Sequence, residues 1–115
     1  REDLICLIQQ ISFKRMDLAF RWIRTYGRKT DRIQSVLDEL LNLVHDAAVL
    51  KMSRNPRAIQ NKDLTHLLEK VANQKSLAAL LDMFDAVHRT KTALKYNANA
   101  QLSLENMFLN FCEAT

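Results

Sequence analysis

Glycine and proline occur once each in this chain of 115 residues, at Gly27 and Pro56. A fold made of strands needs many turns, and turns draw heavily on these two residues. Long helices need neither of them, because both destabilise a helix interior. The scarcity of glycine and proline therefore predicts an all-α fold, a bundle of five or six helices joined by few loops.

The composition fits a single globular domain, which we expect to cover residues 1–115. Hydrophobic residues make up 48% of the chain, enough for one core without a metal or a disulfide. No apolar run is long enough to span a membrane, and no leader peptide is evident. Since the chain begins at Arg1 and not at methionine, we expect it to be excised from a longer protein.

The two cysteines, Cys6 and Cys112, stand near opposite ends of the chain and form no CxxC pattern. A free buried cysteine packs as a small hydrophobic residue. We interpret both as packing residues in a reducing compartment, with a disulfide between them as the less favoured alternative.

Apolar residues recur at intervals of three and four along most of the chain, as they do in amphipathic helices. Asn73 or Ser76 is expected to cap the fourth helix, and Asn99 the last. The predicted helices cover residues 2–26 (with a break near residue 11), 31–53, 62–73, a long segment through 96, and a final segment after 99.

The same periodicity predicts which side chains face the core. Lys91 is the one polar residue within the apolar stripe of the fourth helix. From the second half of the first helix onward, the residues expected to face inward are Ala19, Phe20, Ile23, Ile33, Leu37, Leu40, Leu41, Val44, Ala48, Met52, Leu64, Leu67, Leu68, Val71, Leu77, Leu80, Leu81, Phe84, Val87 and Leu94.

No arrangement of residues that could carry catalysis is evident in the sequence. The histidines His45, His66 and His88 are far apart and form no HExxH motif. A single glycine cannot build a phosphate-binding loop. Asp82 and Asp85 share a helix face but lack the ExxH partner of bundle metal sites, which favours a solvated surface. We therefore expect no enzyme activity, no cofactor and no metal.

The formal net charge of +4 permits a nucleic-acid partner without requiring one. Interspersed acidic residues and the core spacing of the aromatic residues favour solvated faces, and nucleic-acid binding remains the alternative function. The basic residues fall into three groups: Arg21, Arg24 and Arg28 (with Lys14 and Arg32 near them in sequence); Arg89, Lys91 and Lys95; and Lys51, Arg54, Arg57 and Lys62.

The last helix carries more apolar residues than one buried stripe requires. Exposed apolar residues on a small helical domain most often bind a protein partner, and the alternative is burial between other helices. The sequence leaves both open. The residues concerned, and hence the candidate subunit interface, are Leu102, Leu104, Met107, Phe108, Leu109 and Phe111.

The stretch "LKYNANAQLSLENMFLNF" resembles the closing signature of bacterial DNA polymerase III clamp-loader subunits, an Asn-x-Asn turn followed by a helix of the form L-x-L-E-x-x-L-L. Upstream, "VLDELLNLVHDAAVLKMS" is similar to the long helix of the same domain, where Asp46 and Lys51 fit an apolar–Arg–Asp–apolar–apolar run before a lysine. The chain departs from this pattern at His45, where many members carry arginine, and at Ala100, where proline is common. The signature positions are Asn97, Asn99, Leu102, Leu104, Glu105, Phe108 and Leu109.

This resemblance implies an assembly role without chemistry of its own. In clamp-loader subunits the C-terminal helical domain packs beside the same domain of the other subunits and forms a collar that holds an ATPase ring together. The implied partners are the delta and gamma/tau subunits, in the bacterial cytoplasm, with no DNA contact expected from this domain. Because the chain stops close to the signature helix, delta-prime is favoured over gamma/tau. A small-ligand-binding bundle ranks last among the hypotheses.

Overall fold

The computed structural model describes residues 16–26, 30–53, 62–96 and 99–113, and these form helices joined by short connections, with no strand. The all-α prediction is thus confirmed. The expectations for Cys6, Lys14, Arg28, Arg54, Arg57 and Asn97 lie outside the described residues. The elements are α2 (Met16–Tyr26), α3 (Thr30–Ser53), the 3-10 turn η2 (Lys62–Leu64), α4 (Thr65–Gln74), α5 (Leu77–Lys95) and α6 (Ala100–Glu113).

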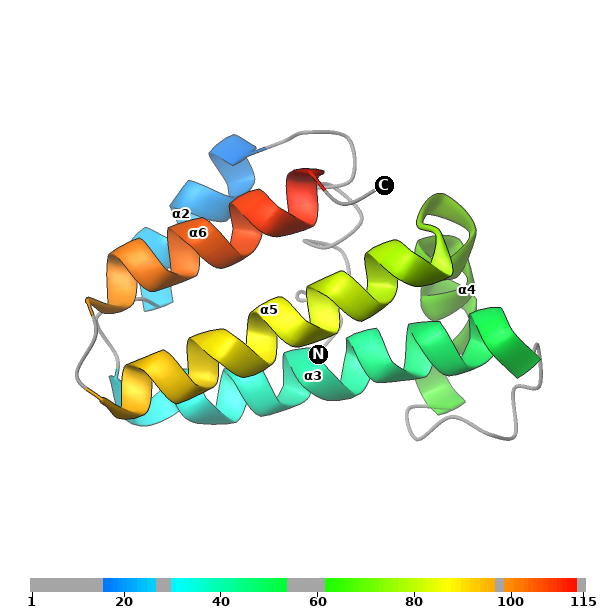
Figure 1. Ribbon diagram of the computed structural model, residues 1–115, viewed down its shortest axis with the longest axis horizontal. Coiled ribbons are helices and arrows are strands. Elements are labelled where there is room, and N and C mark those ends of the chain that lie inside the picture. The colour runs from blue at the N-terminus through cyan, green and yellow to red at the C-terminus, as the bar shows by residue number, and fades with distance from the viewer. Residues whose placement is uncertain (1–15, 27–29, 54–61, 97–98, 114–115) are drawn as a thin grey trace.

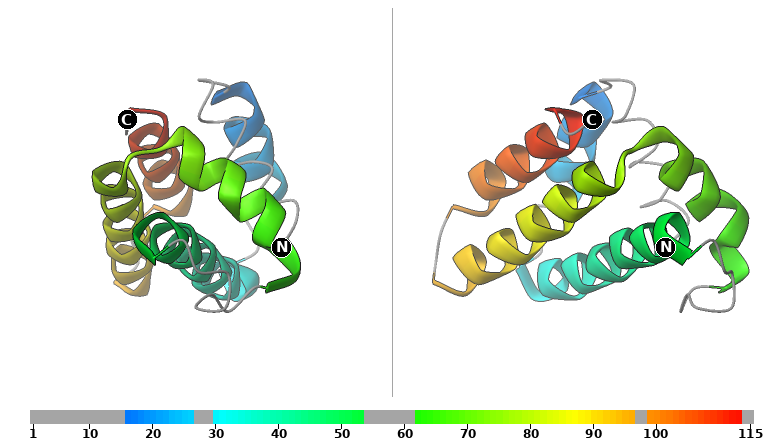
Figure 2. Two further views of the ribbon diagram at one scale, coloured as in Figure 1. Left: turned by 90° about the vertical axis from the view of Figure 1, so that its right-hand side faces the viewer. Right: turned by 45° about the vertical axis from the view of Figure 1, so that its right-hand side comes forward.

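The long helices α3 and α5 lie side by side and run in opposite directions (Figure 1). Helix α6 turns back along α5, and α2 packs against α6. Helix α4 packs on α3 and crosses one end of the bundle, where it leads from α3 to the start of α5 (Figure 2). In the end-on view of Figure 2, α2 and α5 flank α6 on opposite sides.

The turn between α4 and α5 shows how local sequence sets the helix ends. The backbone N–H of Lys75 still donates to the Val71 carbonyl at 3.1 Å, but Lys75 itself is extended, with φ −118° and ψ 144°. Ser76 then caps α5, because its hydroxyl accepts a hydrogen bond from the Ala79 N–H at 3.1 Å. Of the two candidate caps, Ser76 is the one used.

One buried cluster with residues from every described α-helix forms the core. Three residues expected to face inward are largely exposed instead: Phe20 (43%), Met52 (63%) and Leu81 (53%). The prediction was wrong for Leu81 because α5 packs against α3 and α6 together, so its buried arc centres on Met83. Met52 lies beyond the core in the last turn of α3.

Candidate subunit interface

Helix α6 begins at a side-chain cap. The Asn99 side-chain oxygen accepts a hydrogen bond from the backbone N–H of Leu102 at 2.9 Å, and the Asn99 carbonyl accepts one from the N–H of Ser103 at 3.0 Å. A helix start leaves four backbone N–H groups without helical partners, and the Asn99 side chain satisfies one of them. The turn before the helix therefore sets where α6 starts.

The inner face of α6 belongs to the core. Leu104, Met107, Phe108 and Phe111 are each 0–1% exposed. The Phe108 ring meets Trp22 of α2 edge to face, with ring centroids 5.5 Å apart, and meets Phe111 in the same way at 5.7 Å. These four members of the predicted interface set are buried within their own bundle, because α2 covers the flank of α6 that α5 leaves open.

The outer face of α6 carries the other two members of the set. Leu102 is 57% exposed and Leu109 is 45% exposed. They are seven positions apart, which places both on one side of the helix, two turns from each other. The large apolar side chains that α6 leaves exposed are therefore Leu102 and Leu109, with the exposed Asn106 between them.

The far end of α6 is held by Lys75, a residue that no sequence pattern singles out. Its side-chain nitrogen donates to the Phe111 carbonyl at 2.9 Å, and the residue is only 4% exposed. The last four carbonyls of a helix lack helical partners, so this lysine satisfies one of them. Burial lowers the pKa of Lys75, while the nearby Cys112 thiol acts in the opposite direction. Nothing in the spacing of the neighbouring polar residues marks Lys75 as buried.

The segment of α3 that resembles the long helix of clamp-loader subunits contacts the neighbouring helices. Asp46 is fully buried, with its carboxylate 3.8 Å from His45 Nδ1. The half-exposed His45 ring lies 6.3 Å from the ring of Phe84 on α5. Lys51 donates to the Ala72 carbonyl at 2.9 Å and so closes the end of α4. The run therefore ties α3 to both of its neighbouring helices.

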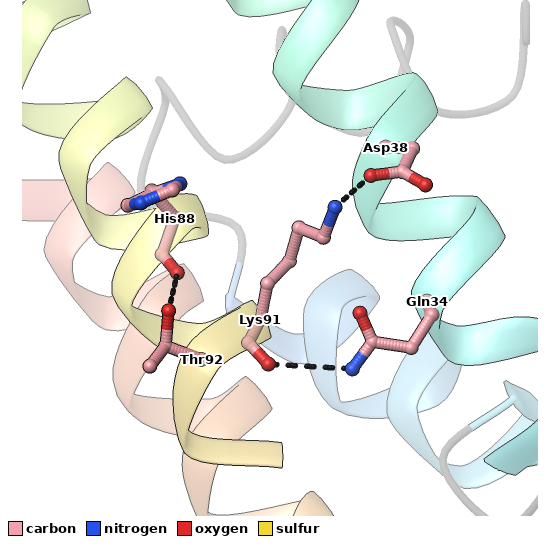
Figure 3. A network of polar contacts seen from close by, with 5 residues as sticks. All are labelled: Gln34, Asp38, His88, Lys91 and Thr92. Carbon is pink, nitrogen blue, oxygen red and sulfur yellow. Dashed lines mark hydrogen bonds and ion pairs between the residues drawn. The ribbon is translucent and has the colours of Figure 1, made fainter. Parts of the chain in front are cut away.

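Lys91, the polar residue within the apolar stripe of α5, finds its partner on α3 (Figure 3). Its ammonium group donates to the Asp38 carboxylate, and the Lys91 carbonyl accepts from the Gln34 amide at 3.3 Å. On the same stretch of α5, the Thr92 hydroxyl donates to the His88 carbonyl at 3.2 Å. Lys91 thus links α5 to α3 through two polar contacts.

The three histidines and the acidic pair Asp82 and Asp85 are exposed at the surface of their helices. His45, His66 and His88 are exposed and lie on α3, α4 and α5 respectively. Asp85 pairs with Arg89 one turn later, at 3.0 Å. Within the described ranges, no three His, Cys, Asp or Glu side chains gather as a metal site would require. None of the helices that the structure describes has the length and apolar character needed to cross a bilayer.

The basic groups do not form one free surface in the part of the chain that is described. Lys51 and Lys91 are engaged by Ala72 and Asp38, and Arg89 by Asp85. Arg21 and Arg24 are exposed on α2. A site for nucleic acid needs several cations on one side, with aromatic or helical groups free to reach the bases. Lys51, Lys91 and Arg89 already have partners within the fold.

A family model described as DNA polymerase III, delta subunit, C terminal, matches residues 27–113. The matched residues make up most of the chain and contain the described helices α3 to α6. The chain belongs to this family. No curated protein and no solved structure matches it. As the C-terminal domain of a delta-type subunit, it is a non-catalytic component of the clamp-loader family, and the match does not separate delta-prime from gamma/tau.

Proposed function

We propose that this domain assembles the clamp loader of DNA polymerase III by packing against the C-terminal domains of other clamp-loader subunits in a collar. The observation that carries the proposal is the outer face of α6, where Leu102 and Leu109 are exposed on a helix fixed at both ends. Exposed apolar residues arranged along one face are typical of protein–protein contact sites. The family supplies the class of partner, because delta subunits work within a multisubunit polymerase.

We assign the domain to a delta-prime subunit, with delta and gamma/tau subunits as its partners in the bacterial cytoplasm. The support is the family model, which is named for a delta subunit, together with the correspondence of α6, capped at Asn99, to the signature helix that clamp-loader subunits share. The alternative within the same family is the gamma/tau subunit. Domains of both kinds would use the collar for assembly and would leave nucleotide chemistry to other domains.

Reconstitution with purified partner subunits tests the assembly role. The double variant Leu102→Glu/Leu109→Glu of the full-length subunit places two charges on the outer face of α6, where a neighbour would have to desolvate them. We expect it to be folded by circular dichroism and to be absent from the reconstituted complex on size-exclusion chromatography.

The control is Met52→Glu, which places a charge on an exposed apolar side chain in the last turn of α3. This variant should assemble as the unaltered subunit does. Normal assembly of the Leu102→Glu/Leu109→Glu variant would show that α6 does not contact a neighbour. Equal loss in both variants would show that the effect is not specific to α6.

A further inference from the structure

A shallow hollow of about 250 Å³ lies between α5 and the C-terminal part of α6. It is lined by Asp82, Asp85 and Arg89 from α5 and by Asn110 and Glu113 from α6. Three carboxylates thus face one guanidinium group. The hollow is acidic although the chain as a whole carries a formal charge of +4.

Only part of this negative charge is compensated within the described structure. Asp85 pairs with Arg89 at 3.0 Å, and both side chains are 65% exposed. Asp82 and Glu113 are exposed and have no cationic partner among the described residues. Two carboxylates are therefore available to a positive group brought from outside.

Glu113 connects the hollow with the outer side of α6, because it lines the hollow and shares a helix side with the two exposed leucines. Leu102, Asn106, Leu109 and Glu113 recur at spacings of four, three and four residues, so they share one side of the helix. Asn110, which follows Leu109 directly, turns toward α5 and lines the hollow. A partner that covers the two leucines would also cover the carboxylates of Asp82 and Glu113.

We infer that the α5–α6 face, defined by Leu102, Leu109, Asp82 and Glu113, receives a basic amphipathic helix of the neighbouring collar domain. That helix would set apolar residues against the leucines and lysine or arginine side chains against the two carboxylates. The inference rests on the proposed function, since it specifies the chemistry of the neighbour at that interface. Complementary charge of this kind fixes the register of a contact and speeds encounter more than it adds affinity.

Helix α2 of this chain carries an exposed face that combines an aromatic and a basic side chain, which is the composition expected of the neighbour's helix. On α2, Phe20 is 43% exposed, and the exposed Arg24 lies four positions further along the same helix. Helices α2 and α5 lie on opposite flanks of α6 (Figure 2). Domains placed side by side need two different faces that match, and a neighbour built on the same pattern would present its basic helix to this acidic one.

Charge reversal in the full-length subunit tests the inference. The variant Asp82→Lys/Glu113→Lys reverses both available carboxylates, and the control Glu39→Lys/Glu69→Lys makes the same change in net charge at exposed positions on α3 and α4. Binding of each to the purified delta and gamma/tau subunits is measured at low and at high salt. We expect affinity at low salt to fall about tenfold or more for the first variant and to change less than about twofold for the control.

The salt dependence of the unaltered subunit supplies a second readout. Its affinity should fall as salt rises, and the Asp82→Lys/Glu113→Lys variant should lose that dependence because the charge pairs no longer form. If the Asp82→Lys/Glu113→Lys variant binds the partner subunits as tightly as the unaltered subunit and the control variant do, the acidic face does not receive the neighbour. If the unaltered subunit binds none of these partners, the proposed function itself is wrong.

Discussion

At the scale of single residues, Asn99 decides where α6 begins. Its side-chain oxygen accepts a hydrogen bond from the backbone N–H of Leu102. Alanine would leave that donor without its partner in the folded chain. We expect Asn99→Ala to lower the free energy of unfolding by about 1 kcal/mol and the melting temperature by roughly 4 °C. Chemical and thermal denaturation measure both quantities. Asn99→Asp keeps the acceptor and should stay close to the original stability, and equal losses in the two variants would contradict the capping role.

Phe108 is the residue whose replacement should affect the fold most directly. It is fully buried between Trp22 and Phe111, so Phe108→Asp would place an unpaired charge in the core. Loss of the aromatic side chain alone costs about 3–5 kcal/mol, a large part of the stability of a small domain. We expect Phe108→Asp to be unfolded by circular dichroism.

A conservative change at the same site separates packing from contact with a partner. Phe108→Leu should remain folded at reduced stability, and the fluorescence of Trp22, the one tryptophan of the chain, should change because its ring contact is lost. A folded Phe108→Asp variant with failed subunit assembly would instead place Phe108 at the interface.

At the scale of the helices, two lysines close helix ends from a distance in sequence. Lys51 binds a carbonyl near the end of α4, and Lys75 binds one near the end of α6. Both sites lie where the helix dipole favours positive charge. Lys75 differs in being buried, and burial lowers its pKa below the ordinary value of 10.5. The charge of Lys75 therefore makes the stability of the fold depend on pH.

The pH dependence from Lys75 has a defined sign. Below its folded pKa, Lys75 is charged in both states, and burial of that charge costs stability. As pH rises from there toward 10.5, the folded state releases the proton while the unfolded state keeps it, so the cost disappears. We expect the unfolding free energy of the unaltered chain, minus that of Lys75→Met, to increase over this interval.

Denaturation of both proteins across that range of pH provides the measurement, and groups common to the two proteins cancel in the difference. A Cys112→Ser background tests the opposing effect of the nearby thiol, and there the increase should be larger. A difference that stays flat or decreases with pH would mean that burial does not lower the pKa of Lys75.

The sequence predicted the helices well because their ends have local chemical causes. Ser76 and Asn99 cap α5 and α6 through hydrogen bonds to residues three positions away. Capping residues of this kind can be recognised from the local sequence. The buried partner of Lys75 is 36 residues distant, and the partner of Lys91 is 53 residues distant. No periodic pattern along one helix predicts contacts of that kind.

The candidate site was predicted only in part, for a related reason. The apolar content of α6 was evident, but which of its residues face solvent depends on the two helices that flank it. Because α2 and α5 both pack against α6, four of the six residues enter the core, and Leu102 and Leu109 remain outside. The acidic hollow combines Asp82 with Glu113, which come from different helices and meet only in the folded chain.

At the scale of the whole molecule, the distribution of exposed groups makes a prediction about solution mass. The exposed leucines of α6 are few, and the buried cluster joins all the described α-helices without a second chain. Stable interfaces between identical subunits commonly bury large apolar areas. We therefore expect the purified domain to be a monomer by size-exclusion chromatography with light scattering, over a series of concentrations.

Addition of other clamp-loader subunits then separates the remaining assignments within the family. A monomer that enters a larger complex only with delta and gamma/tau subunits fits delta-prime, whose neighbours in a collar are different chains. A trimer or tetramer of the domain alone fits the gamma/tau subunit, which must also pack against copies of itself. A monomer that joins none of these partners would contradict the collar role, and Leu102 and Leu109 would then be exposed leucines of the kind found singly on most protein surfaces.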